Sequence, residues 1–309
     1  MPGERPADSE TQRLNEKERS RLLDRYRVRH GDGFRLADHD PADTGGPHIN
    51  HANGPAMLAA GVERLSDLQT RLYAQGSRAV LMLLQAMDAA GKDGTIKHVM
   101  SGVNPQGVMV TSFKAPSSLE LAHDFLWRSS LALPARGMIG VHNRSHYEEV
   151  LVTRVHPEIL GHEKAPGTQD PGAKFWKRRL QDIRCFERHL VREGTTVVKI
   201  FLHLSKQEQK RRFLSRLDTP EKNWKFSAAD IAERRHWSAY MDAYQEAIAG
   251  TARPYAPWFV VPADNKWFAH LVVVEALCEA MEKLNLSMPD VPAEEKARLA
   301  AARAELEAE

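Results

Sequence analysis

One short stretch of the chain combines small residues, a lysine and two aspartates at a spacing that suits phosphate binding. The run LLQAMDAAGKDGTIK occupies residues 83–97 and overlaps the end of an apolar segment, 79–84. Where such a segment turns into a helix, main-chain N–H groups surround an anion and a lysine, here Lys92, neutralises it. The usual pattern G-x-x-x-x-G-K-[ST] is incomplete, because Ala86 replaces the first glycine and Asp93 replaces the hydroxyl residue.

The aspartates of this loop indicate phosphates that are bridged by a metal ion. Mg²⁺ is commonly held by one or two carboxylates together with substrate phosphates, so we expect Asp88 to hold it. The residues expected to contact phosphate in and after the loop are Ala89, Ala90, Gly91, Lys92, Asp93, Gly94, Thr95 and Lys97.

A second polar cluster, GVHNRSHYEE at 140–149, follows another apolar run. In phosphate-transfer enzymes an acid at the end of a strand near the phosphate loop commonly holds Mg²⁺. Asn143 takes that place here, and Glu148 follows about one helical turn later. Capping of the next helix by Asn143 is the alternative, but Arg144 beside it favours an anion site. We assign catalysis to Asp88, Lys92, Asn143 and Arg144, and metal binding to Asp88 and Glu148.

A third block, SKQEQKRRFLSR at 205–216, is strongly basic. On a helix Arg212 and Arg216 share one face, and apolar side chains, Leu214 and Leu217 among them, are expected to pack on the other. A solvated basic face is the ordinary explanation of such a run. Behind a phosphate loop it also fits a mobile lid, which brings guanidinium groups to a transferring phosphoryl group and excludes water. The lid residues expected to bind phosphate are Lys206, Arg211, Arg212 and Arg216.

Other side chains carry weaker signals. The residues assigned to nucleotide contacts are Lys114, Arg128, Asn143, Lys222, Trp224 and Lys225. The histidines are scattered, and the turn expected between His142 and His146 breaks the spacing that a zinc pair on one helix needs. Cys185 and Cys278 lack metal-ligand spacing, so we expect both to be buried reduced thiols.

These motifs need a scaffold that brings them together, and the apolar pattern predicts one. Runs that resemble strands occupy 79–84, 108–113, 138–142, 195–204 and 258–261. Helix-like segments occupy 10–27, 57–75, 119–131, 174–192, 206–217, 228–249 and 266–284. This alternation predicts an α/β fold with a parallel sheet covered on both faces. Ligands of such sheets bind beyond the carboxyl ends of the strands, where all three motifs lie.

Composition is that of an ordinary globular enzyme. The chain has 309 residues, of which 42% are hydrophobic and 27% are charged. Its formal net charge of +2 argues against a protein that binds nucleic acid over much of its surface. No apolar run reaches membrane-spanning length and no signal core is visible, so we expect a cytoplasmic protein that engages neither nucleic acid nor membrane. We divide the chain into an N-terminal arm (1–54), one domain (55–285) with a lid at about 206–250, and a C-terminal tail (286–309).

Four motifs in this order resemble the polyphosphate kinase 2 family. They are QAMDAAGKDGT at 85–95, SGVNPQGV at 101–108, NRSHYE at 143–148 and DTPEKNWKFS at 218–227. The resemblance runs from about Arg35, through ADHDPADTGG at 37–46, to about Leu284. It implies a three-layer αβα, P-loop kinase-like fold with a helical lid. It also implies Mg²⁺-dependent phosphoryl transfer between inorganic polyphosphate and an adenine nucleotide.

The resemblance also assigns roles to single residues. Asp88 corresponds to the family's metal-associated catalytic aspartate, Lys92 contacts phosphates, and Arg144 with the lid arginines lines the polyphosphate path. Asn143 followed by Arg-Ser-x-Tyr-Glu is similar to the subgroup that phosphorylates both AMP and ADP, and the loss of a carboxylate there lowers repulsion against a monophosphate. The segment 161–172 looks like an insertion. Family members are commonly homo-oligomers, so a dimer or tetramer is expected.

Two other functions fit parts of this pattern. A nucleoside monophosphate kinase uses ATP as donor, so omission of ATP separates it from polyphosphate-driven transfer. A non-catalytic protein that binds RNA or another polyanion through its basic stretch has no use for an acid in the loop. In such a protein Asp88→Ala spares or improves binding, whereas in an enzyme it abolishes turnover.

Overall fold

The sheet is built around strand β2, Ala79–Ala86, in which all eight residues are buried. A continuous apolar run of this kind is typical of a strand covered on both faces. In the computed structural model, which describes residues 14–46, 48–163 and 165–309, this strand lies inside a six-stranded sheet. The other strands are β1 (Arg27–Val28), β3 (Val108–Ser112), β4 (Ile139–Asn143), β5 (Thr195–His203) and β6 (Trp258–Pro262).

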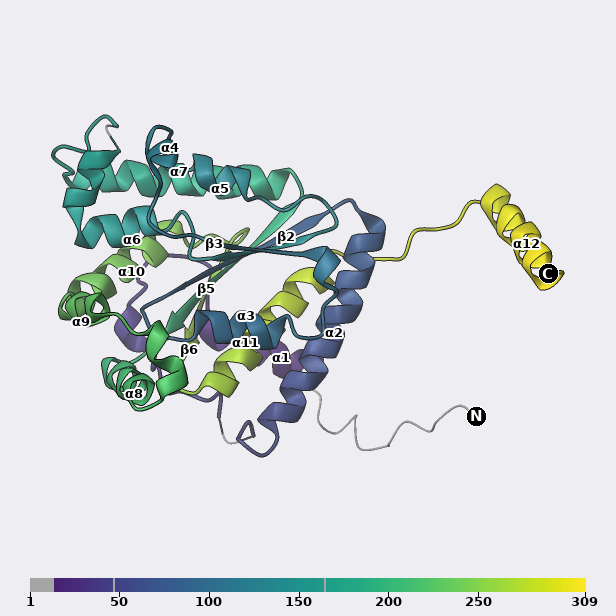
Figure 1. Cartoon of the computed structure of the whole chain (residues 1–309), viewed down its shortest axis with the longest axis horizontal. Helices are drawn as coiled ribbons and strands as arrows, with labels where there is room; N and C mark the ends of the chain where they lie inside the picture. Colours follow the sequence, from purple (N-terminus) through teal and green to yellow (C-terminus); the bar gives the residue numbers. More distant parts are fainter. Residues whose placement is uncertain (1–13, 47, 164) are drawn as a thin grey trace.

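The strand order is β1-β6-β5-β2-β4-β3. Strands β2 to β6 pair in parallel, as predicted, and β1 adds an antiparallel edge that was not predicted. One face of the sheet packs against α1 (Glu16–Tyr26), α2 (Gly54–Gln75), α3 (Lys92–Val99) and α11 (Lys266–Glu282). The other face packs against α6 (Glu148–Val155), α7 (Ala173–Arg192) and α10 (Trp237–Thr251) (Figure 1). The predicted three-layer αβα arrangement is therefore confirmed.

Two predicted helices are divided in the structure. The segment 119–131 forms α4 (Ser118–Leu121) and α5 (Trp127–Leu131), because the Asp124 carboxylate accepts the Leu126 N–H and closes a turn between them. The segment 228–249 forms α9 (Ala228–Arg235) and α10, which meet at His236.

The segment that projects from the sheet edge is shorter than the predicted lid, because α10 packs in the core against α6 and α7. Its elements are α8 (Lys206–Leu217), the 3-10 helix η5 (Pro220–Lys225) and α9 (Figure 1). The expectation that Leu214 and Leu217 pack is wrong: they are 51% and 45% exposed, on the outer face of α8. Cys185 is likewise exposed on α7, whereas Cys278 is buried as expected.

The two ends of the described chain join the domain differently. Residues 14–53, predicted as an arm, are an integral part of it, because α1 buries Leu22, Leu23 and Tyr26 in the core and β1 extends the sheet. The tail carries α12 (Ala293–Glu307), which has no buried residue and stands away from the body (Figure 1). Within the three described ranges, none of the helices is long and apolar enough to cross a membrane.

Removal of residues 289–309 is expected to leave the melting temperature unchanged, because α12 buries nothing against the domain. As a contrast, Leu271→Ala in α11 removes a fully buried side chain and should cost about 2–5 kcal/mol of unfolding free energy. Thermal and urea unfolding of both variants measure this. A large loss of stability on tail removal would show that α12 docks on the body.

Candidate functional site

The phosphate loop connects β2 to α3 at the carboxyl edge of the sheet. Two of its residues have left-handed backbone angles, Ala89 with φ of 64° and Gly91 with φ of 106°. Lys92, the first residue of α3, folds back so that its Nζ donates to the Ala86 carbonyl at 2.9 Å. The first turn of α3 leaves main-chain N–H groups without helical partners at this point, which suits an anion.

Arg212 of α8 is the buried support of this loop. Its Nη1 donates to the carbonyls of Ala89 (3.1 Å) and Ala90 (2.7 Å), and its Nη2 donates to those of Ala263 (2.5 Å) and Asp264 (3.1 Å). Its Nε donates to a carboxylate of the same helix at 2.7 Å. These contacts use all five N–H groups of the guanidinium. The sequence-based assignment of Arg212 as a phosphate ligand is therefore corrected, because this side chain holds the loop instead.

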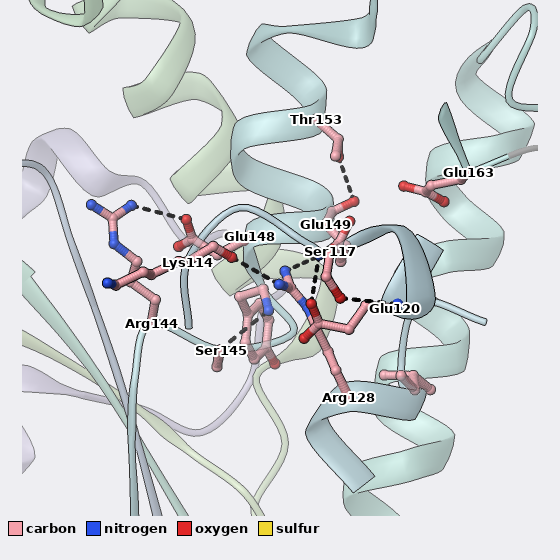
Figure 2. Close-up of polar contacts among 12 residues, drawn as sticks. Lys114, Ser117, Glu120, Arg128, Arg144, Ser145, Glu148, Glu149, Thr153 and Glu163 are labelled. Atoms are coloured by element: carbon pink, nitrogen blue, oxygen red, sulfur yellow. Dashed lines mark hydrogen bonds and ion pairs between the residues drawn. The ribbon is translucent and has the colours of Figure 1, made fainter. Parts of the chain in front are cut away.

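Arg144 brings the loop and the end of β4 together. It has a left-handed backbone (φ 65°), and its N–H donates to the Leu84 carbonyl at 3.0 Å. Its Nη2 lies 3.0 Å from Asp88 Oδ1 and its Nη1 lies 3.1 Å from Glu148 Oε2, and Figure 2 shows the second contact. Burial works against the charged guanidinium, but Glu148 and Asp88 raise the pKa of Arg144 and keep it charged.

Asn143 contacts the phosphate loop rather than capping a helix. Its Nδ2 donates to Asp93 Oδ1 at 2.8 Å and to Ser112 Oγ at 3.4 Å. The cap position of α6 is occupied by Tyr147. Capping by Asn143, the alternative reading of the sequence, is therefore wrong, and the amide instead joins the ends of β3 and β4 to the loop.

A polar cavity of about 670 Å³ opens over these groups. It is lined by many of the predicted residues, namely Asp88, Ala89, Gly91, Lys92, Asp93, Gly94, Lys114, Asn143, Arg144, Arg216 and Trp224. Six other predicted phosphate ligands are not among its lining residues, namely Ala90, Thr95, Lys97, Lys206, Arg211 and Arg212. Arg211, for example, is exposed and pairs with Glu208 of its own helix. The side chains of Lys222 and Lys225 lie outside the part of the chain that the structure describes.

A second cavity, of about 530 Å³, adjoins the first and shares Phe113, Lys114 and Arg144 with it. Apolar side chains such as Val152 and Ile159 form much of its wall. Its other polar lining residues are His162 and five that Figure 2 labels: Arg128, Glu148, Glu149, Thr153 and Glu163. The segment 161–172, which looks like an insertion in the sequence, thus contributes part of this wall through His162 and Glu163.

Arginine partners neutralise the buried acids of the second cavity. Arg128 donates to Glu149 Oε1 at 2.8 Å and to the Lys114 carbonyl at 2.8 Å, and Arg179 of α7 pairs with Glu163. Burial, with Glu163 nearby, raises the pKa of Glu149 to about 7 against the opposing effect of the arginines. Arg128, assigned to nucleotide contacts from the sequence, therefore lies at the second cavity as a structural partner of Glu149.

The acids of the polar cavity fit a magnesium site that substrate phosphates and water complete better than a site built from protein ligands alone. Among residues 14–46, 48–163 and 165–309, no group of three or more His, Cys, Asp and Glu side chains is placed to hold a metal. Asp88 and Asp93 nevertheless line the cavity, and Mg²⁺ usually takes few carboxylates and completes its shell with phosphates and water. Glu148, the second predicted metal ligand, lines the other cavity and pairs with Arg144.

Several lining residues were missed from the sequence. Lys266 and His270 follow the carboxyl end of β6, so the same strand-end rule applied to 258–261 would have identified them. Asp230 also lines the polar cavity, and burial together with Asp88 raises its pKa. Its position in the capping box of α9 concealed it, because the sequence pattern there is that of a helix start.

Anion binding is expected to weaken as pH rises through about 8. Burial and the nearby Arg144 lower the pKa of Lys92 to about 8, although Asp88, Glu148 and Asp93 oppose the shift. Only the protonated ammonium neutralises phosphate, so affinity should fall by up to about tenfold between pH 7 and 9. Calorimetric titration with tripolyphosphate measures this, and Lys92→Arg should remove most of the dependence. An equal pH dependence in that variant would contradict the assignment.

Arg212→Lys is expected to cost about 3 kcal/mol of unfolding free energy, because it leaves buried carbonyls without donors. Arg211→Lys is the matched control, since Arg211 is exposed, adjacent and paired with the same Glu208. It should leave the unfolding midpoint unchanged. Urea unfolding of both variants measures the difference, and equal midpoints would show that Arg212 does not support the loop.

Comparison with known proteins agrees with this geometry. The family model described as polyphosphate kinase 2 matches residues 48–289. An ADP-polyphosphate phosphotransferase of Rhodopseudomonas palustris is 56% identical over 241 residues, which are 78% of this chain and 83% of that protein. An AMP/ADP-polyphosphate phosphotransferase of Meiothermus ruber is 44% identical over 267 residues, 86% of this chain and 96% of that protein.

A solved structure gives the same result for the fold. The crystal structure of polyphosphate kinase 2 from Arthrobacter aurescens matches with a TM-score of 0.81 at 43% identity, and the match covers 92% of this chain and 96% of that one. The sheet order and the phosphate loop thus correspond to a P-loop kinase-like fold. The chain belongs to the polyphosphate kinase 2 family.

Proposed function

We propose that this protein transfers phosphoryl groups from inorganic polyphosphate to AMP and ADP in the presence of Mg²⁺. The observation that carries the proposal is the junction of the two cavities at Phe113, Lys114 and Arg144. One cavity is polar and holds the phosphate loop, and the other has an apolar wall that suits a nucleobase. The names of the two relatives, with ADP in one and AMP/ADP in the other, support the same substrates.

In this proposal polyphosphate lies in the polar cavity and the nucleoside lies in the second one. The loop N–H groups and Lys92 bind phosphate oxygens of the polyphosphate. Arg144, at the junction, orients the transferring phosphoryl group and offsets the charge that develops on it. Catalysis of this kind is mostly positioning and charge neutralisation, since the protein forms no covalent bond to the phosphoryl group.

Asp88 and Asp93 are the residues that would hold Mg²⁺, which when bound supplies further neutralisation of the phosphate charge. Asn143 supports the use of AMP as well as ADP. Its amide donates to Asp93 and adds no negative charge next to the acceptor phosphate, whereas an aspartate there would repel it. A cytoplasmic location and assembly into dimers or tetramers remain predictions within this proposal.

The test omits ATP: purified protein is incubated with AMP, polyphosphate and Mg²⁺, and the nucleotides are separated by chromatography. ADP and then ATP should appear, and chelation of Mg²⁺ should stop their formation. Asp88→Asn should lower kcat by about 10²-fold or more while polyphosphate binding persists. A requirement for added ATP would show a nucleoside monophosphate kinase. Polyanion binding without turnover would show a binding protein.

A further inference from the structure

A buried charged network lies behind the Arg144 turn, and the proposed reaction makes no direct use of it. Lys199 of β5, Glu187 of α7 and Tyr147 are all fully buried. Lys199 Nζ donates to Glu187 Oε2 at 2.7 Å, to the Tyr147 hydroxyl at 3.2 Å and to the Thr251 carbonyl at 2.9 Å. The Tyr147 hydroxyl donates to Glu187 Oε1 at 2.6 Å.

Stability alone does not explain this network. Removing two charges from water is unfavourable, and apolar residues of similar volume often stabilise a core as well or better. Burial lowers the pKa of Lys199, and Glu187 offsets only part of this effect. The hydrogen bonds of such a buried network can, however, fix a single arrangement of the elements that they join.

One end of the network reaches the catalytic turn through the main chain. Tyr147 caps α6, and the first residue of that helix is Glu148, which pairs with Arg144. The N–H of Tyr147 donates to Ser145 Oγ at 3.2 Å, and the same oxygen accepts from Gln85 of β2 at 3.0 Å. Through its hydroxyl and its N–H, Tyr147 therefore anchors a turn whose other end is Arg144.

Arg144 needs such an anchor, because a left-handed backbone is unfavourable for a side chain with a Cβ. Its φ of 65° persists only where neighbouring contacts enforce it. The Arg144 N–H bond to the Leu84 carbonyl holds one end of the turn, and Tyr147, whose hydroxyl is bonded to Glu187 and Lys199, holds the other. The direction of the guanidinium toward Asp88 depends on both.

The other end of the network reaches the carboxyl end of α10. Thr251 is the last residue of α10, and its carbonyl accepts from Lys199. Its Oγ1 lies 2.9 Å from the Tyr147 hydroxyl oxygen. Helix α10 begins directly after α9, so it is the return path of the chain from that segment into the core. The network thus joins the carboxyl end of α10 and the catalytic turn to the same buried groups.

We infer that Tyr147, held by Lys199 and Glu187, is a positioning residue that sets the direction of Arg144 in the transfer reaction. This inference rests on the proposed function. Tyr147→Phe keeps the ring and removes the hydroxyl. It should lower kcat on the order of ten- to hundredfold, as expected for a misplaced catalytic group. The KM values for AMP and polyphosphate should change by less than about twofold.

A double-mutant cycle with Arg144→Lys separates positioning from general damage. If Tyr147 acts through Arg144, Tyr147→Phe should change kcat by less than about twofold in the Arg144→Lys background. The double variant Lys199→Met, Glu187→Met should fold, because apolar replacements of a buried ion pair are tolerated. Its kcat should fall by a factor similar to that of Tyr147→Phe. Tyr26→Phe is the matched control: its buried hydroxyl donates to Asp43 Oδ2 at 2.8 Å in the opposite layer. It should leave kcat unchanged.

The outcomes are distinct. Equal losses in both backgrounds, or full kcat in Tyr147→Phe, would overturn the positioning role and leave the proposed function intact. Full turnover by Arg144→Lys alone would overturn both the role of Arg144 and that of Tyr147. Absence of polyphosphate-dependent transfer by the unmodified protein would refute the proposed function itself.

Discussion

The arrangement of the site depends on the hydrogen bonds of one buried guanidinium. Arg212 connects the phosphate loop to the chain after β6 through four main-chain carbonyls. Arginine is the side chain suited to this, because it offers five donors in a fixed plane and keeps its charge when buried. Helix α8 is thereby attached to the loop by its inner face, so the loop and the start of the projecting segment form one unit.

Several charged groups at the polar cavity already have protein partners before any substrate is present. Arg144 lies between Asp88 and Glu148, and Asn143 holds Asp93. An incoming phosphate therefore replaces existing partners instead of meeting bare charges, which limits reorganisation when the reaction occurs. The same pairing keeps a half-buried cluster of charges from destabilising the fold.

Much of this architecture was predictable because it follows from local pattern. The buried run at 79–84 and the Gly-Lys turn after it specify strand, loop and helix start, and the parallel sheet then gathers strand ends at one edge. Arg144 was found for this reason. The antiparallel β1 was not, since two residues carry no periodic signal.

Side-chain roles were harder to predict than positions. The periodicity of α8 placed Arg212 and Arg216 on one face. Only the packing shows that Arg212 donates its hydrogen bonds to main-chain carbonyls, whereas Arg216 lines the cavity. The burial of α10 likewise comes from contacts with α6 and α7, which lie far away in the chain. Tertiary context decides such cases, and a single sequence contains little of it.

The edge strand β3 has a further consequence for how the enzyme can diversify. Phe113 and Lys114, directly after this strand, border both cavities, which the proposed function assigns to the donor and the acceptor. A substitution at either residue that changes the specificity for the nucleotide is therefore expected to change the specificity for the donor as well. Laboratory evolution toward new bases would therefore advance more freely from the far wall at Val152 and Ile159, where the two preferences are uncoupled.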